Sequence, residues 1–132
     1  MSDFILHSFK FEEGIDYMQV EGVVSPKFYG LVNPARSASL QFLQMLDANY
    51  RIISAGRSDD EAERNTDILA NPEQIGTTDT WGPFIITKDD FATFMEKYLI
   101  DLNTWHITVH QEFIDSINEL AAEEGNKVLF WR

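Results

Sequence analysis

Apolar and polar residues alternate near the start of the chain. Residues 4–11, FILHSFKF, are rich in aromatic side chains, and Gly14 separates them from a second segment with apolar positions at residues 15–24, IDYMQVEGVV. Alternation on both sides of a glycine is typical of two strands joined by a tight turn, so we expect a β-hairpin around Gly14. Residues 27–32, KFYGLV, are expected to add a third strand.

After residue 32 the apolar residues no longer recur at every second position but at the three- or four-residue spacing of a helix. Asn33 and Pro34 supply an N-cap side chain and a proline at the first helical position. Together with the apolar face that follows, they predict a helix at about 34–48. The alternative is a hairpin in which residues 39–46 pair with residues 50–56. The segment at 50–56, YRIISAG, is a predicted strand in either case.

The middle of the chain contains an acidic stretch, SDDEAERNTD, at residues 58–67. Ser58 and Glu61 have the spacing of a capping box, and acidic side chains favour the first turn of a helix because its N-terminus is positive. We therefore expect either a helix at about 59–70 that lies on the surface or a loop that is partly mobile. A loop is expected at residues 71–80.

The last 50 residues have the clearest pattern. Strands are predicted at residues 83–87 (PFIIT), 104–108 (TWHIT) and 127–131 (KVLFW). Spacings that resemble capping boxes begin at Thr87 and at Thr108, and an amphipathic helix follows each of them. This order predicts two consecutive strand–helix units that end in a strand.

Together these elements predict one domain, residues 1–132, of mixed α+β class. We expect an N-terminal hairpin or meander, then helices, and then the two strand–helix units with the final strand. A single sheet packed against helices is the simplest arrangement that buries their apolar faces.

The net charge of the chain limits the classes of macromolecule that it is expected to bind. The chain has 132 residues, 22 acids and 10 bases, for a net charge of −12, and residues 57–101 hold eleven of the acids. A surface of this sign repels nucleic acid and anionic membranes and attracts basic proteins. The absence of cysteine and of a long apolar segment agrees with a cytoplasmic protein that has neither a signal peptide nor a transmembrane helix.

Motifs for catalysis or cofactor binding are absent. His106 and His110 are four residues apart, but their spacing spans a predicted strand–helix boundary, where a shared metal ion is not expected. Paired carboxylates such as Asp89-Asp90 are explained by helix starts, helix ends and turns. There is no nucleophile motif and no glycine-rich phosphate loop. We expect no catalytic residue, no bound metal and no cofactor.

An acidic stripe is predicted on the last helix. Glu112, Asp115, Glu119 and Glu123 fall within an arc of about 80 degrees, opposite the apolar face. No lysine or arginine occurs between His110 and Asn126 to neutralise the stripe. It is either a solvated face or a docking face for a basic partner.

The three tryptophans divide into two groups. Trp105 and Trp131 lie in predicted strands and are expected in the core. Trp81 follows a polar loop, where it either packs under the loop or anchors an interface. The predicted partner-binding set therefore comprises Asp59, Asp60, Glu61, Glu63, Asp67, Trp81, Glu112, Asp115, Glu119 and Glu123.

In size, acidity and lack of cysteine or catalytic motifs, the whole chain resembles bacterial immunity proteins that block nuclease toxins. That resemblance implies a protein that covers the active site of a basic toxin with its carboxylates. The chain is also similar in size and charge to the small acidic α+β chaperones of bacterial secretion systems, which dimerise and hold an unfolded effector segment. A small enzyme without a recognisable motif is the third alternative. The oligomeric state is left open.

Overall fold

The computed structural model of the protein describes residues 5–17, 28–29, 38–71 and 80–132. These residues have an α+β fold that begins and ends with a strand. The elements in chain order are β1 (Ile5–Lys10), β2 (Phe28–Tyr29), α1 (Ala38–Ala48), α2 (Asp59–Ala70), β3 (Trp81–Ile86), α3 (Lys88–Thr104), α4 (Gln111–Ala122) and β4 (Lys127–Trp131).

The strands form one antiparallel sheet in the order β2-β1-β4-β3. The first and last long strands therefore pair at its centre, where Leu6 lies opposite Trp131 and Phe9 lies opposite Val128. At the outer edge of β3, Ser54 forms an isolated bridge with Ile85. Apolar residues on both faces of β3 and β4 are buried, because covering segments pack against both sides of the sheet.

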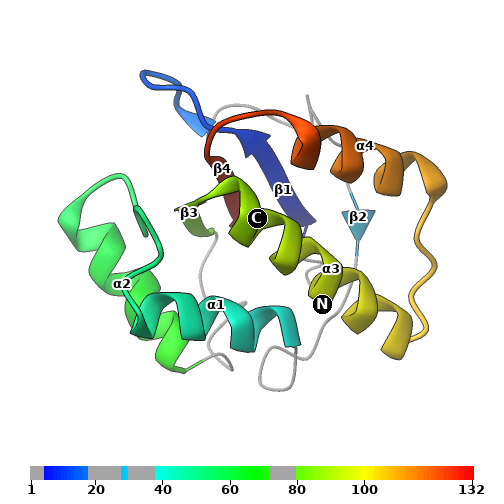
Figure 1. Ribbon diagram of the computed structural model, residues 1–132. Helices are drawn as coiled ribbons and strands as arrows, with labels where there is room; N and C mark the ends of the chain where they lie inside the picture. The colour runs from blue at the N-terminus through cyan, green and yellow to red at the C-terminus, as the bar shows by residue number, and fades with distance from the viewer. Residues whose placement is uncertain (1–4, 18–27, 30–37, 72–79) are drawn as a thin grey trace.

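The helices supply the main core on one face of the sheet. Figure 1 shows α3 crossing in front of the strands, with α1 and α2 on one side and α4 on the other. Alternate strand residues such as Phe84 and Leu129 point into this core and meet the apolar faces of all four helices. The expected single sheet packed with helices is confirmed.

A smaller aromatic cluster occupies the opposite face of the sheet. Phe9, Tyr17, Val128 and Phe130 are buried there. The His7 ring stacks on Phe130 with ring centroids 4.8 Å apart. Strand alternation places these side chains opposite the helix-facing residues, so each of the two central strands serves two cores.

Several predicted elements are confirmed and others are wrong. Helix α1 rules out the hairpin alternative at residues 39–46, α2 has the predicted bounds, and β4 is the predicted final strand. The strand predicted at 50–56 does not form: Tyr50 adopts a positive φ of 56° after α1, and only Ser54 bridges to the sheet. Short apolar runs of this kind fit either state by periodicity alone.

The strand predicted at 104–108 is also wrong, because α3 continues to Thr104 and then turns. Leu102, in the last turn of α3, is fully buried, so packing extends the helix into the predicted strand. His106 then takes a positive φ of 56° and leads to α4. The two strand–helix units are therefore one unit, β3–α3, followed by a second helix.

The predicted hairpin around Gly14 is only partly described. Residues 11–17 form a turn instead of a strand end, with Gly14 at a φ of 82°. The hydroxyl of Tyr17 donates to the carbonyl of Lys10 at 2.8 Å and so closes this turn. Residues 18–27 and 30–37, which include most of the predicted second and third strands and the start of the predicted helix, lie outside the described residues.

Candidate functional site

Helix α2 carries the acidic stretch on the surface. The Ser58 hydroxyl accepts a hydrogen bond from the Glu61 N–H at 3.2 Å, as a capping box requires. The reciprocal bond is different: the Glu61 carboxylate accepts from the Arg57 N–H at 2.8 Å and pairs with its guanidinium at 2.8 Å. The exposed carboxylates of this helix are Asp59, Asp60, Glu63 and Asp67.

Arg57 joins the start of α2 to the turn at residues 11–17. Its guanidinium also pairs with Asp16 at 3.1 Å, between segments 41 residues apart in the sequence. The hydrogen bond from Arg57 lowers the pKa of the Glu61 carboxyl below its ordinary value. One arginine therefore holds two carboxylates together, and both ion pairs are partly exposed.

A small apolar cavity of about 210 Å³ lies between this turn and the sheet. Tyr17 forms one wall, and burial raises the pKa of its phenol. Gly56 and Arg57, just before α2, form the opposite wall, and Ile85 and Val128 belong to the sheet beneath. We call this cavity the Tyr17 pocket. It brings the acidic stretch next to an apolar site, which sequence reasoning did not predict.

Helix α4 carries the second acidic surface. Glu112, Asp115, Glu119 and Glu123 are all exposed, while Phe113, Ile117 and Leu120 are buried on the other side of the helix, as the spacing predicted. The amide of Gln111 donates to Asp115 at 2.9 Å. Among the described residues no ion pair involves Glu112, Asp115 or Glu119.

The C-terminal end of α4 is less negative than the rest of the stripe. Lys127 is buried, and its amine donates to the backbone carbonyl of Glu123 at 2.6 Å. A cation at this position satisfies a free carbonyl and suits the negative end of the helix dipole. Burial lowers the pKa of the Lys127 amine, and the nearby Glu123 charge opposes that shift. Lys88 pairs with Glu124 at 2.8 Å.

An open groove of about 480 Å³ lies between the end of α3 and the start of α4. Leu99, Ile107, Val109 and Ile114 give it apolar walls, and His106 adds a polar group. Trp105, the residue before His106, is 44% exposed instead of lying in the core as predicted. The strand that was expected to bury it is absent, so its indole stays on the surface.

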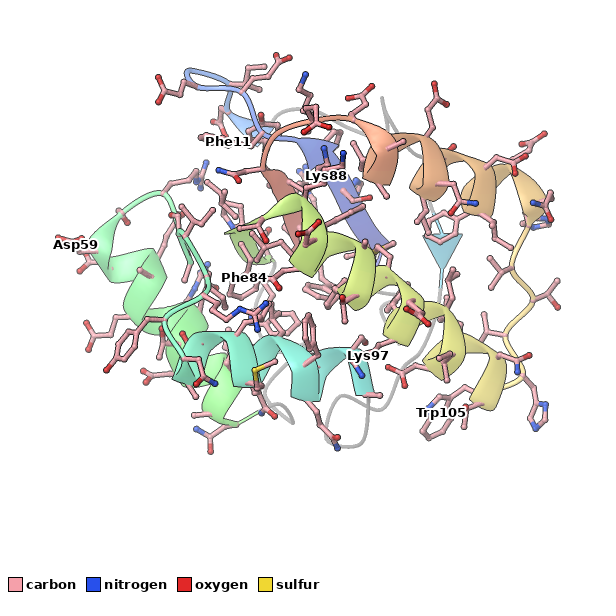
Figure 2. All side chains as sticks on the ribbon, in the orientation of Figure 1. Phe11, Asp59, Phe84, Lys88, Lys97 and Trp105 are labelled. Carbon is pink, nitrogen blue, oxygen red and sulfur yellow. The ribbon has the colours of Figure 1, made fainter. Side chains whose placement is uncertain are left out.

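The two acidic helices lie at opposite ends of the molecule. Figure 2 shows Asp59 on α2 at the left, Trp105 at the end of α3 at the lower right, and α4 across the upper right. The predicted partner-binding residues therefore form two separate surfaces. Trp81 belongs to neither, since its indole is 1% exposed in β3 and packs against Trp131 with ring centroids 4.3 Å apart. Trp81 is removed from the partner-binding set.

Other titratable side chains have structural roles. The buried Asp90 carboxylate pairs with Arg51. The backbone N–H of Asp90 donates to the Thr87 hydroxyl at 3.2 Å, so Thr87 is the N-cap of α3, as its spacing predicted. The buried Asp101 carboxylate accepts from the N–H groups of Ala38 and Ser39 at 2.9 Å each. It thereby caps α1 from a neighbouring helix, a role with no local sequence signal.

The two histidines lie in the turn that connects α3 to α4. His106 and His110 are both exposed, and His110 is the N-cap of α4 without a side-chain hydrogen bond to the helix. The helix start predicted at Thr108 is therefore two residues too early. Within the parts of the chain that the structure describes, no group of three or more histidine, aspartate or glutamate side chains has a geometry suited to a metal ion.

Comparison with known proteins returned no match: no family profile, curated protein or solved structure is similar to this chain. The described helices include none that is long and apolar enough to cross a membrane.

Proposed function

We propose that this protein binds a basic protein partner and blocks it, in the manner of an immunity protein that covers the active site of a toxin. The α2 end makes the main contact, and the acidic stripe of α4 adds long-range attraction. A nuclease is a suitable target, because the lysines and arginines that hold its phosphate substrate are complementary to exposed carboxylates.

One observation carries this proposal: carboxylates from two distant segments gather at the α2 end next to an apolar pocket. Asp59, Asp60 and Glu63 are exposed on α2, and Glu12 and Glu13 are exposed on the turn beside it. Arg57 is the basic residue between them, and it is already paired. Interfaces of high affinity combine a pocket that receives an apolar anchor with a polar rim, and the α2 end has an apolar pocket with carboxylates around it.

The α4 stripe supports a different part of the same function. Its carboxylates lie on a helix face with no described cation beside Glu112, Asp115 and Glu119. Exposed charges of one sign raise the rate at which an oppositely charged partner arrives, and they contribute less to the lifetime of the complex. The stripe therefore supports long-range attraction of a basic partner to the protein as a whole.

The test is affinity capture from a lysate of the source cell with the immobilised chain at low salt, followed by elution with a salt gradient. We expect one basic protein that elutes with salt and whose activity falls when the chain is added. Binding that ignores salt contradicts the proposal, because screening weakens exposed ion pairs. Capture of no basic protein also contradicts it.

A pair of charge-matched variants makes this test specific to the surface. In one variant Asp59, Asp60 and Glu63 become lysine, and in the other Glu112, Asp115 and Glu119 become lysine. Both change the net charge by the same amount on exposed helix positions. We expect the α2 variant to lose capture and the α4 variant to keep it with weaker retention. Equal loss by both would show that net charge alone governs binding.

A secretion chaperone is the second candidate, and the groove between α3 and α4 favours it. Exposed apolar side chains near that groove, Trp105 and Ile100, are of the kind that hold an unfolded segment. This candidate predicts a dimer in solution and tight binding of a permanently unfolded polypeptide. Sedimentation as a monomer, together with no binding of reduced and alkylated lysozyme, would argue against it.

A further inference from the structure

The Tyr17 pocket has an apolar interior. Its volume is about 210 Å³, and its lining consists mainly of carbon atoms from aromatic, aliphatic and proline side chains. All of its lining residues belong to the described parts of the chain. The apolar ones are Phe11, Ile15, Tyr17, Pro83, Ile85 and Val128.

The volume of the pocket limits what it can hold. Cavities that bind whole cofactors or drug-sized molecules usually have volumes of about 300–1,000 Å³. The Tyr17 pocket, at about 210 Å³, is smaller than this range and suits a single large side chain. Pockets that receive one side chain at the centre of an interface provide much of the binding free energy between proteins.

The walls of the pocket are held in place before any partner binds. The Tyr17 hydroxyl donates to the carbonyl of Lys10 and accepts from the Glu12 N–H, which fixes the turn. A Cβ on Gly56 would lie 2.7 Å from the backbone nitrogen of Ala62, so this segment packs directly on α2. A preformed site loses less conformational entropy on binding than a site that has to be ordered.

The rim of the pocket is negative. Glu12 and Glu13 lie at the opening and are exposed, and Arg57 is paired with Asp16 and Glu61. The rim therefore carries more negative than positive charge. Positive groups on both sides of an inserted side chain would be attracted to it, and negative groups would be repelled.

We propose that the Tyr17 pocket receives one aromatic or large aliphatic side chain from a segment of a protein partner, with lysine or arginine on both sides of it. This inference rests on the proposed function, since it specifies the anchor with which a basic partner binds at the α2 end. The apolar interior selects the side chain, and the carboxylate rim selects its neighbours.

The test uses short peptides as probes of the full chain. Acetyl-Lys-Lys-Phe-Lys-Lys-amide is titrated against the ¹⁵N-labelled protein, beside a peptide with alanine in place of phenylalanine and one with glutamate in place of every lysine. We expect the phenylalanine peptide to bind about tenfold more tightly than the alanine peptide, because burying an aromatic ring is favourable by more than 1 kcal/mol. The largest changes in backbone amide chemical shift should occur at Gly14, Ile15 and Gly56.

Two exposed isoleucines provide a matched pair of variants. Ile15 lines the pocket and is 42% exposed, whereas Ile53 is 54% exposed and lies outside its lining. We expect Ile15→Ser to reduce the preference for phenylalanine over alanine at least threefold and Ile53→Ser to leave it unchanged. The thermal unfolding midpoint of each variant shows that the fold is retained. A double variant, Glu12→Gln with Glu13→Gln, should lower the affinity for both basic peptides by the same factor.

The outcomes separate this inference from the proposed function. Equal, salt-sensitive binding of the phenylalanine and alanine peptides overturns the anchor pocket and leaves charge-driven binding of a basic partner intact. Equal binding of the acidic and basic peptides contradicts the requirement for lysine or arginine on both sides of the inserted side chain. Binding of neither basic peptide overturns the pocket as well. A strong preference for phenylalanine, combined with no capture of a basic protein from the cell, supports the pocket and contradicts the proposed function.

Discussion

Helices α2 and α4 are both acidic and exposed, yet their surroundings differ. At the α2 end, Arg57 pairs with two carboxylates and the apolar Tyr17 pocket lies beside them. On α4, the carboxylates of Glu112, Asp115 and Glu119 have no cation among the described residues, and the nearby groove is wider and more open. The same residue types therefore lie in two different settings, one beside an apolar pocket and one on an open helix face.

The difference shows that two helices with similar exposed charge can have different surroundings. Exposed like charges alone are hydrated at little cost and add little binding affinity, although they favour partners of opposite charge. An apolar pocket beside the charges adds a contribution to the binding free energy that depends on the shape of the partner. The α2 end has both features, exposed carboxylates and an apolar pocket, in a preformed arrangement.

The largest effect that would separate the two helices concerns stability. Asn65 on α2 is fully buried, and its amide donates to the Ala55 carbonyl and accepts from the Gly82 N–H at 3.2 Å. Asn65→Ala leaves both groups unpaired and should reduce the free energy of unfolding by about 2–4 kcal/mol. Urea unfolding measures this. Asn118→Ala, at an exposed position on α4, should change it by less than about 0.5 kcal/mol.

The next effect concerns the rates at which an identified basic partner binds and dissociates. Replacement of Asp59, Asp60 and Glu63 by lysine should raise the dissociation rate about tenfold, because contacts at the interface are lost. Replacement of Glu112, Asp115 and Glu119 by lysine should instead lower the association rate about threefold at low salt. Surface plasmon resonance at two salt concentrations measures both rates. The reverse assignment would place the contact on α4.

A smaller effect concerns the helix starts. Ser58 caps α2 with its hydroxyl, and His110 caps α4 without a side-chain hydrogen bond. Ser58→Ala should lower the free energy of unfolding by about 1 kcal/mol, and His110→Ser should raise it by about 0.5 kcal/mol. Thermal unfolding of both variants measures the changes. Destabilisation by His110→Ser would show that the imidazole makes a contact that the helix needs.

The smallest effect is a pH dependence at the α2 end. The pKa of Glu61 is lowered by Arg57, so its contribution to stability is complete above pH 4.5 and is lost as the pH falls through the lower value of the folded state. Because the pair is partly exposed, the change should be a few tenths of a kcal/mol. The stability difference between the wild type and Glu61→Gln should shrink as the pH falls below 4.5. A constant difference would contradict the ion pair.

Long elements with strong periodicity were predictable from the sequence. The acidic helix α2 was predicted with its bounds, and the caps at Ser58 and Thr87 form as their spacings indicated. Two short apolar segments were predicted as strands that do not form. Residues 50–56 and 104–108 have strand-like patterns, but one follows α1 as a turn and the other is absorbed by the end of α3, because long-range packing decides such ambiguous runs.

The candidate site was predictable only in part. The exposure of the acidic residues on α2 and α4 followed from spacing, since charged side chains occupy the face opposite the apolar one. The burial of Trp81 and the exposure of Trp105 depended on which strands form and pair. Neither indole carries a local signal that separates a core position from a surface one.

By itself the sequence determined an acidic α+β protein with two charged helix faces, because helix periodicity and charge are local properties of the chain. Only the tertiary structure placed those faces at opposite ends and brought the turn at 11–17 against the start of α2. The Tyr17 pocket is built from four segments that are far apart in the sequence. Such a pocket depends on antiparallel pairing of the first and last strands, and no local pattern records that pairing.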